Sequence, residues 1–181
     1  MQTRYLIGID LIQYRSDILQ CVKDNPQICD YESFLNINDD EAILSEISSY
    51  IQSYDSCIEG IFDDDYDFLY GFVIYDKIRL TDDGNSAEIH ICSCKHIWGK
   101  DFYKIYKNIL KYSMFDVLYA NMPACCRGAI TLCKKLGFKK TGYVPKTIPY
   151  TTTKGEVKMF DELIYTYVNK RCLPDKEEVP F

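Results

Sequence analysis

Hydrophobic residues along the chain follow two different periods, and each change of period marks the border of a predicted element. Residues 4–9 read as a short strand, and apolar residues at helical spacing follow from about Leu11 to Lys23. Asn25-Pro26 ends this segment, and Asn38-Asp39-Asp40-Glu41 then supplies N-cap oxygens and first-turn negative charge. The pattern therefore predicts a strand followed by two helices.

From Cys57 the hydrophobic period changes to two. Three strands are expected at residues 57–62, 68–78 and 87–94, separated by the acidic run 63–65 and by Asp82-Asp83-Gly84-Asn85. Because both breaks are typical of hairpin turns, the three strands should form an antiparallel meander.

The rest of the chain alternates between helical and strand patterns. Residues 99–114 carry an apolar stripe of period 3.6, residues 116–121 read as a short strand, and residues 124–136 are again amphipathic, with Gly137 placed as the C-terminal cap. Two strands follow, at residues 141–150 and 157–168, on either side of a turn at Lys154-Gly155. A strand, helix, strand crossover of this length normally joins parallel neighbours, so strands 87–94 and 116–121 should run parallel.

Composition limits the class of protein. A chain of 181 residues, 47% hydrophobic, is expected to form one domain over residues 1–170, followed by a charged tail at 171–181. The net charge of −6 argues against a nucleic-acid partner. No apolar run is long enough for a membrane span, and nine cysteines without an export signal favour reduced thiols in the cytoplasm.

One stretch carries a family signature. The segment from Cys126 to Tyr143 reads CRGAITLCKKLGFKKTGY and resembles the Asn-x-x-Ala-Ile-x-Leu-Tyr-x-Lys-Leu-Gly-Phe-x-x-x-Gly-Tyr pattern of the GCN5-related N-acetyltransferases (GNAT). The order of elements from residue 4 to 168 also looks like that family. The resemblance implies an α/β (α+β) fold with a mixed, mostly antiparallel central sheet of about seven strands and about four helices.

The resemblance also implies a site for acetyl-CoA. In the family, the strand and loop before the third helix bind the cofactor, and free N–H groups at a helix start suit its pyrophosphate. His96 stands at a Gln/Arg position of the family pattern, Gly99 is retained, and Asp101 replaces a small residue. Cys126 takes the place of a family Asn, and Cys133 the place of the Tyr that serves as general acid. The predicted cofactor-binding residues are Cys92, Cys94, Lys95, His96, Trp98, Gly99, Lys100, Asp101, Cys126 and Cys133.

Three residues are candidates for catalysis. Glu88 and His90 share one face of the strand that precedes the cofactor loop, where family members often carry a general base. Tyr143 is a further possible proton donor. Structural interpretations remain open, because a carboxylate after a turn can be merely solvated and Cys133 can be a packing residue.

Alternating His and Cys residues after Glu88 suggest a metal site as an alternative to reduced thiols. His90, Cys92, Cys94 and His96 alternate along one strand and all are zinc-binding residue types. Four ligands along an extended strand span roughly 20 Å, too far for one tetrahedral site. The prediction is therefore no metal.

Two functions follow from the resemblance. The first is acetyl-CoA-dependent N-acetyl transfer to an amine of a small molecule or protein. The alternative is a catalytically inactive GNAT-like binding or structural protein. One version of this alternative is a bacteriophage protein, located in the host cytoplasm or the virion, with phage structural proteins as partners. An enzyme should keep a gap between the strands ending near Cys94 and Asn121, where the pantetheine arm inserts in the family.

Overall fold

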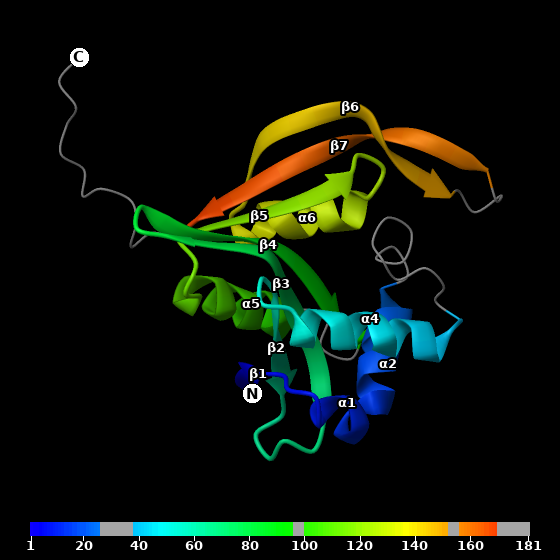
Figure 1. Cartoon of the computed structure of the whole chain (residues 1–181). Helices are drawn as coiled ribbons and strands as arrows, with labels where there is room; N and C mark the ends of the chain where they lie inside the picture. Colours follow the sequence, from blue (N-terminus) through cyan, green and yellow to red (C-terminus); the bar gives the residue numbers. More distant parts are fainter. Residues whose placement is uncertain (26–37, 96–99, 152–155, 170–181) are drawn as a thin grey trace.

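The computed structural model describes residues 1–25, 38–95, 100–151 and 156–169 (Figure 1). They form one seven-stranded sheet in the order β1-β2-β3-β4-β5-β7-β6. Only β4 and β5 are parallel, and the other neighbours are antiparallel. The strands are β1 (Gln2–Tyr5), β2 (Cys57–Phe62), β3 (Leu69–Thr81), β4 (Gly84–Ser93), β5 (Val117–Pro123), β6 (Lys139–Thr151) and β7 (Val157–Val168).

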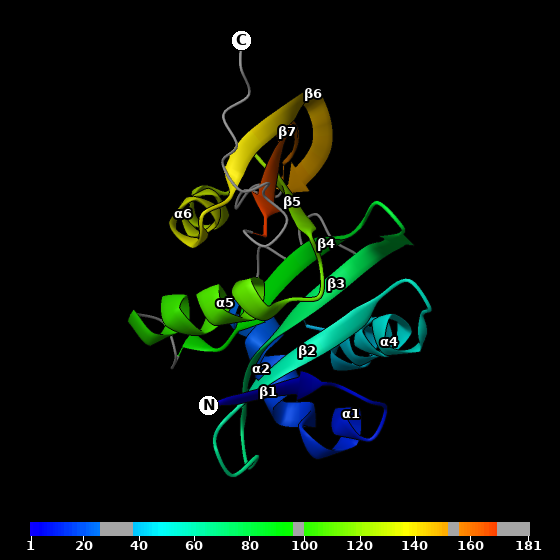
Figure 2. The same ribbon diagram turned by 90° about the vertical axis from the view of Figure 1, so that its left-hand side faces the viewer.

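Helices cover both faces of the sheet, as Figure 2 shows. The helices α2 and α4 pack against β2, β3 and β4 on one face, and α5 and α6 lie together on the other. The helices in the described part of the chain are α1 (Asp10–Gln13), α2 (Arg15–Asp24), α4 (Asp40–Gln52), α5 (Lys100–Tyr112) and α6 (Arg127–Leu136). The mixed, mostly antiparallel sheet and the parallel β4–β5 pair confirm the predicted fold class and crossover.

The N-terminal elements differ from the prediction in their bounds. The first strand is shorter than residues 4–9 and ends at Tyr5. The predicted helix 11–23 is divided at Tyr14 into α1 and α2, so the described residues hold five helices rather than about four. Tyr14 is 2% exposed, packs on Phe62 and donates a hydrogen bond to the Tyr66 carbonyl. These tertiary contacts explain the interruption, because local periodicity does not report them.

Capping signals in the sequence are confirmed at two helix ends. The Asp39 side chain accepts a hydrogen bond from the Ala42 N–H at the start of α4. Gly137 ends α6 in the left-handed region, at φ 98°, and the Phe138 N–H donates to the Cys133 carbonyl. The amphipathic helix that carries the family signature is therefore fixed at its C-terminal end.

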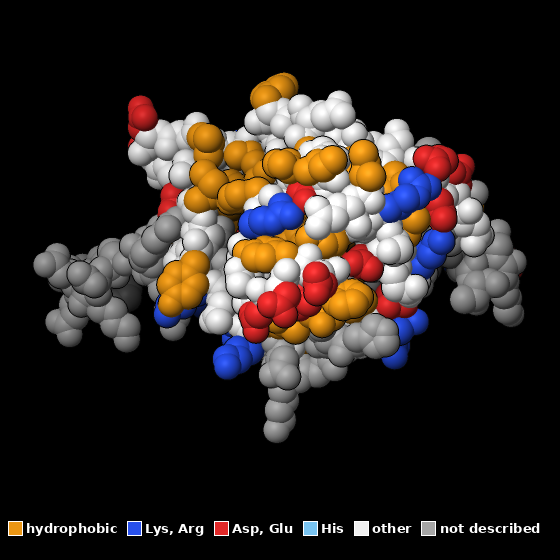
Figure 3. All heavy atoms as spheres, turned by 90° about the horizontal axis from the view of Figure 1, so that it is seen from below, with side chains coloured by type: hydrophobic (Ala, Val, Ile, Leu, Met, Phe, Trp, Pro, Cys, Tyr) orange, Lys and Arg blue, Asp and Glu red, His pale blue; other side chains and the backbone are white. Residues whose placement is uncertain are grey.

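Exposed hydrophobic side chains gather on the β1 side of the molecule, which Figure 3 shows from below. Acidic side chains lie between them on this face. Tyr5 belongs to this surface, and its hydroxyl lies 3.9 Å from the Met114 sulfur. None of the described helices is long and apolar enough to cross a membrane.

Candidate functional site

The two parallel strands at the centre of the sheet separate partway along their length. β4 and β5 are in register at Ser86–Val117, Ala87–Leu118 and Glu88–Tyr119, and no further pair is formed within the described residues. Both strands nevertheless continue, β4 against β3 as far as Ser93 and β5 against β7 as far as Pro123. Figure 1 shows them starting together and then diverging. This β4–β5 split is the gap that the enzyme hypothesis requires.

The split leaves two strand edges facing each other with backbone groups not used by the sheet. Residues 89–93 of β4 and 120–123 of β5 form these edges. Backbone N–H and C=O groups of an open strand edge can pair with an extended molecule that carries amides. The pantetheine arm of CoA has this chemistry, so the residues present fit the cofactor that the sequence implies.

Glu88 lies at the point where the strands separate. Its side chain is buried, with the residue 3% exposed, and its Oε2 accepts a hydrogen bond of 2.6 Å from the Lys77 ammonium. Burial of a carboxylate is costly without such a partner. Hydrogen bonding to Glu88 is also the main cause that raises the pKa of Lys77.

Lys77 reaches Glu88 because the β3 backbone is irregular there. The β3–β4 register shifts between Asp76 and Arg79, and Lys77 has φ 51°, a left-handed value that is uncommon for a residue with a side chain. Its N–H donates to Asp76 Oδ1 at 2.8 Å. The bulge therefore presents an ammonium to the buried carboxylate.

Tyr119 is the partner of Glu88 across the last pair of strands. Burial, and then the negative charge of Glu88, raise the pKa of its phenol. In a parallel pair, residues in register share a face, so Tyr119 and Glu88 lie on the same side of the sheet, with His90 two residues further along β4. His90 is half-buried. The structure thus brings Glu88 and His90 to the split, and sequence reasoning missed Tyr119 and Lys77.

The end of β4 is held by the end of α2. The Asn25 amide donates to the Ser93 carbonyl at 2.7 Å, and Asp24 accepts from the Lys95 N–H at 2.8 Å. The Lys95 ammonium lies 3.4 Å from the other Asp24 oxygen. These contacts fix where β4 leaves the sheet towards α5.

The predicted cofactor cysteines on β4 belong to the core. Cys92 is 0% exposed and Cys94 is 6% exposed. The Cys94 thiol contacts that of Cys21 on α2, and this hydrogen bond, together with burial, raises the pKa of Cys21. All three side chains pack as buried thiols, so Cys92 and Cys94 would contact a cofactor through their backbone.

The loop that the sequence assigns to the pyrophosphate is not described. His96, Trp98 and Gly99 lie outside the described residues, so their predicted roles remain predictions. Lys100 and Asp101 form the beginning of α5. A helix therefore does start where the sequence places the anion site.

Both predicted positions on α6 carry buried thiols. Cys126 is the N-cap residue of α6, 8% exposed, and makes no side-chain capping bond. Cys133 is 7% exposed, and burial raises its pKa to about 12. Within the described residues, cysteines 21, 57, 92, 94, 125, 126 and 133 form no disulfide.

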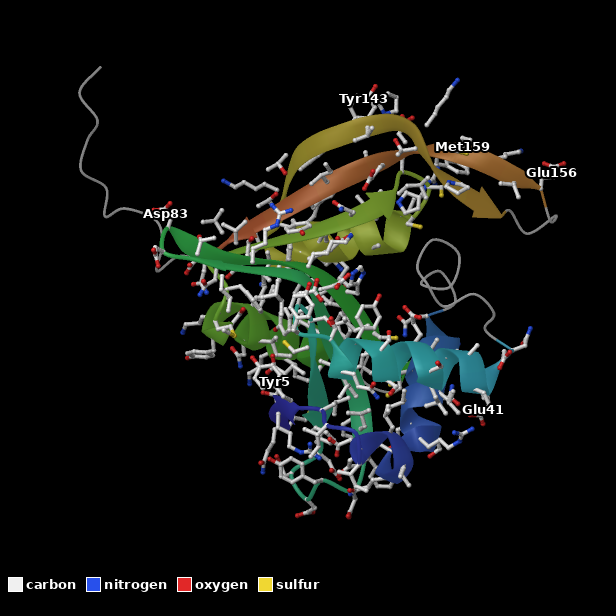
Figure 4. All side chains as sticks on the ribbon, in the orientation of Figure 1. Tyr5, Glu41, Asp83, Tyr143, Glu156 and Met159 are labelled. Carbon is white, nitrogen blue, oxygen red and sulfur yellow. The ribbon has the colours of Figure 1, made fainter. Side chains whose placement is uncertain are left out.

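Tyr143 does not join the other catalytic candidates. It lies on the outer strand β6, separated from β4 by β7 and β5, and is 55% exposed. Figure 4 shows it on the hairpin formed by β6 and β7. Its role as a proton donor remains a prediction without support from its position.

A hollow of about 480 Å³ lies beside the end of β4 but outside the split. Its lining residues come from α2, from β3 and its preceding turn, and from Cys94; none belongs to β5. Within the described residues, no group of three or more His, Cys, Asp or Glu side chains is arranged to hold a metal ion.

Comparison with known proteins identifies the fold. No family model and no curated protein sequence matches the chain. Among solved structures, spermidine N-acetyltransferase from Vibrio cholerae, in complex with CoA and spermine, matches with a TM-score of 0.68 and 18% identity, over 94% of this chain and 96% of that one.

Two other acetyltransferase structures match over similar lengths. The ribosomal-protein-S5-alanine acetyltransferase from Vibrio fischeri has a TM-score of 0.64 and 14% identity, over 96% of this chain and 95% of that one. A GNAT-family acetyltransferase from Bacillus anthracis has a TM-score of 0.65 and 14% identity, over 92% and 93%. The chain therefore has the fold of the GCN5-related N-acetyltransferases, as its sequence predicted.

Proposed function

We propose that this chain is an acetyl-CoA-dependent N-acetyltransferase that modifies an amine of a small molecule or protein. The observation that carries the proposal is the β4–β5 split, where register ends at Glu88 and Tyr119 although both strands continue. An open pair of strand edges in the middle of a sheet has backbone groups that the sheet does not use, and a bound ligand that carries amides can pair with them.

The reaction needs little covalent chemistry from the protein. The lone pair of the neutral amine forms a bond to the thioester carbonyl carbon, the C–S bond breaks, and CoA leaves as a thiolate that becomes protonated. Holding the two reactants together supplies much of the acceleration. Glu88, buried at the point of separation, is the residue we assign to receive the proton that the amine loses.

Cys133 is unsuited to protonate the departing thiolate. Its pKa of about 12 lies above the roughly 8.5 of an ordinary thiol, so proton transfer to such a thiolate would be uphill by about 4 to 5 kcal/mol. An ordinary thiolate is already a stable leaving group near neutral pH. The replacement of the family's Tyr by Cys133 therefore leaves transfer possible without a dedicated acid on α6.

Calorimetric titration with acetyl-CoA, followed by mass spectrometry of a panel of amines, tests the proposal. We expect binding with one site per chain and a gain of 42 Da on at least one amine. Asp101→Gly removes a negative charge near the helix start and should tighten acetyl-CoA binding by about 1 kcal/mol, whereas Glu88→Gln should lower turnover without weakening that binding. The absence of both acetyl-CoA binding and acetyl transfer, in the natural protein and in every variant, would rule the proposal out.

If the chain is instead an inactive binding or structural protein, we expect no acetyl transfer to any amine. Such a module has no need for a split, and its central strands could pair along their whole length. The bacteriophage origin considered with it has no supporting observation in the fold.

A further inference from the structure

A buried hydrogen-bond acceptor lies in the separated part of β5. Oδ1 of Asn121 is inaccessible to solvent and has no hydrogen-bond partner within the part of the chain that the structure describes. Buried polar atoms in native proteins nearly always have a partner, so this oxygen is available to accept a hydrogen bond from a ligand.

The strand pattern places Asn121 on the same face of the sheet as Glu88, in the part where β4 and β5 have separated. Asn121 follows Tyr119 by two residues, so the two side chains share a face of β5, and Tyr119 shares its face with Glu88 across the last pair of the parallel register. The alternate residues Leu118, Ala120 and Met122 are buried in the core on the opposite face. On β7, Asn121 is opposite Ile164, whose apolar side chain offers no hydrogen-bond donor.

The groups on this face are matched to an amine. They include the Asn121 amide oxygen, the Glu88 carboxylate and the Tyr119 phenol. An amine or ammonium is rich in N–H donors, and all three oxygens can accept from it. One Glu88 oxygen, Oε2, already accepts a hydrogen bond of 2.6 Å from the Lys77 ammonium, so an incoming amine would use the other oxygen.

We propose that Asn121 is a positioning residue for the acceptor amine: its Oδ1 accepts one N–H of the amine and holds the nitrogen beside Glu88 at the mouth of the β4–β5 split. This inference rests on the proposed function and adds to it the residue that orients the nucleophile. Because the Asn121, Glu88 and Tyr119 oxygens are hydrogen-bond acceptors, the expected acetyl acceptors are primary alkylamines, free or on a flexible side chain.

Two substitutions separate this role from a structural one. Asn121→Leu keeps the approximate size and removes the acceptor, whereas Asn121→Asp keeps an acceptor oxygen. The protein, saturated with CoA, is titrated calorimetrically with 1,4-diaminobutane as the probe. Asn121→Leu should weaken amine binding by about tenfold or more, the range expected for a hydrogen bond to a charged group, while Asn121→Asp should retain it. Affinity for CoA alone should be unchanged in both variants.

A stability measurement provides a second readout. Removing an acceptor that has no partner leaves no broken bond behind, so Asn121→Leu should melt at the same temperature as the natural protein or higher. A clear loss of stability would assign Asn121 to the fold and overturn the inference.

The remaining outcomes are also decisive. Reduced CoA affinity in Asn121→Leu with unchanged amine affinity would assign the residue to the acyl donor and overturn the inference, as would an absence of amine binding in the natural protein with or without CoA. If the natural protein binds the amine and Asn121→Leu does not, the inference stands, even where no acetyl transfer is detected and the proposed function fails.

Discussion

Single residues at the site have environments that decide their chemistry, and Cys133 is the clearest example. The sequence leaves open whether this thiol acts as an acid or packs in the core. The structure places it among buried hydrophobic residues of α6, where burial raises its pKa to about 12. The thiolate is disfavoured without nearby positive charge or solvent, so the side chain should be chemically inert in the folded state.

We therefore expect Cys133 to resist alkylation. Native protein treated with iodoacetamide at pH 8 should be labelled slowly at Cys133, because only the thiolate reacts and its fraction is roughly 10⁻⁴ when the pKa is about 12. Cys125, which is half-buried, is the comparison within the same molecule and should be labelled faster. Peptide mapping by mass spectrometry measures both. Labelling of native Cys133 as fast as that of Cys125 would contradict the burial argument.

At the scale of elements, the C-terminal end of α6 tests how the family signature is held in place. Gly137 has φ 98°, a conformation that residues with a Cβ rarely adopt, although a Cβ there would meet the Tyr167 ring only at 3.8 Å. Gly137→Ala should therefore lower the free energy of unfolding by about 1 kcal/mol through backbone strain alone.

Gly128, in the same helix, is the matched control. A Cβ at Gly128 would meet nothing within 4 Å, and its φ is not in the left-handed region, so Gly128→Ala should stabilise the protein by about 0.5 kcal/mol. Urea denaturation of the two variants should give changes of opposite sign. Equal changes in unfolding free energy for the two variants would show that the left-handed cap conformation does not require glycine at position 137.

Another element junction depends on pH. Asp10, at the start of α1, is 1% exposed and accepts two hydrogen bonds from the Arg4 guanidinium of β1, at 2.7 and 2.8 Å, and one from the Ile7 N–H. The hydrogen bonds from Arg4 are the main cause that holds the pKa of Asp10 below its usual value, against burial. The stabilisation is thus fully present above the unfolded pKa of about 3.9 and is lost as pH falls through the lower folded value.

Asp10→Asn should destabilise the protein by about 1 to 2 kcal/mol at pH 7, a value reduced because Arg4 is partly exposed. The difference in unfolding free energy between this variant and the natural protein should shrink as the pH falls below about 3.9. Protonation of Asp10 then weakens its pairing with Arg4 in the natural protein. Urea denaturation at several pH values measures it. A difference that does not change with pH would show that the Arg4 pair contributes nothing through charge.

The elements themselves were largely predictable, and the contacts at the split were not. Alternating and helical periods located the strands and helices, since burial on one face imposes those periods. Lys77 could not be assigned to Glu88 from sequence, because its reach depends on a bulge and a left-handed φ. Asn121 could have been noticed as a polar residue on the same strand face as Tyr119, but its lack of a partner is visible only once neighbouring side chains are placed.

At the scale of the whole molecule, the sheet consists of two antiparallel parts joined by one short parallel contact. Strands β1 to β4 form one part, and β5, β7 and β6 form the other (Figure 2). Three registered pairs connect them near the Asp82-Asp83 turn, and the edges beyond are open. A ligand bound along these edges would therefore contact both parts of the sheet and should stabilise the native state as a whole.

Hydrogen exchange of the backbone, followed by mass spectrometry with and without acetyl-CoA, tests this account most directly. If acetyl-CoA binds in the β4–β5 split, the amides of residues 89–93 and 120–122 that face the split should exchange more slowly in its presence. Amides of β1 and β2, far from the split in the sheet order, should show the smaller change. If exchange at residues 89–93 and 120–122 is the same with and without saturating acetyl-CoA, the claim that this split is the acyl-CoA site is contradicted.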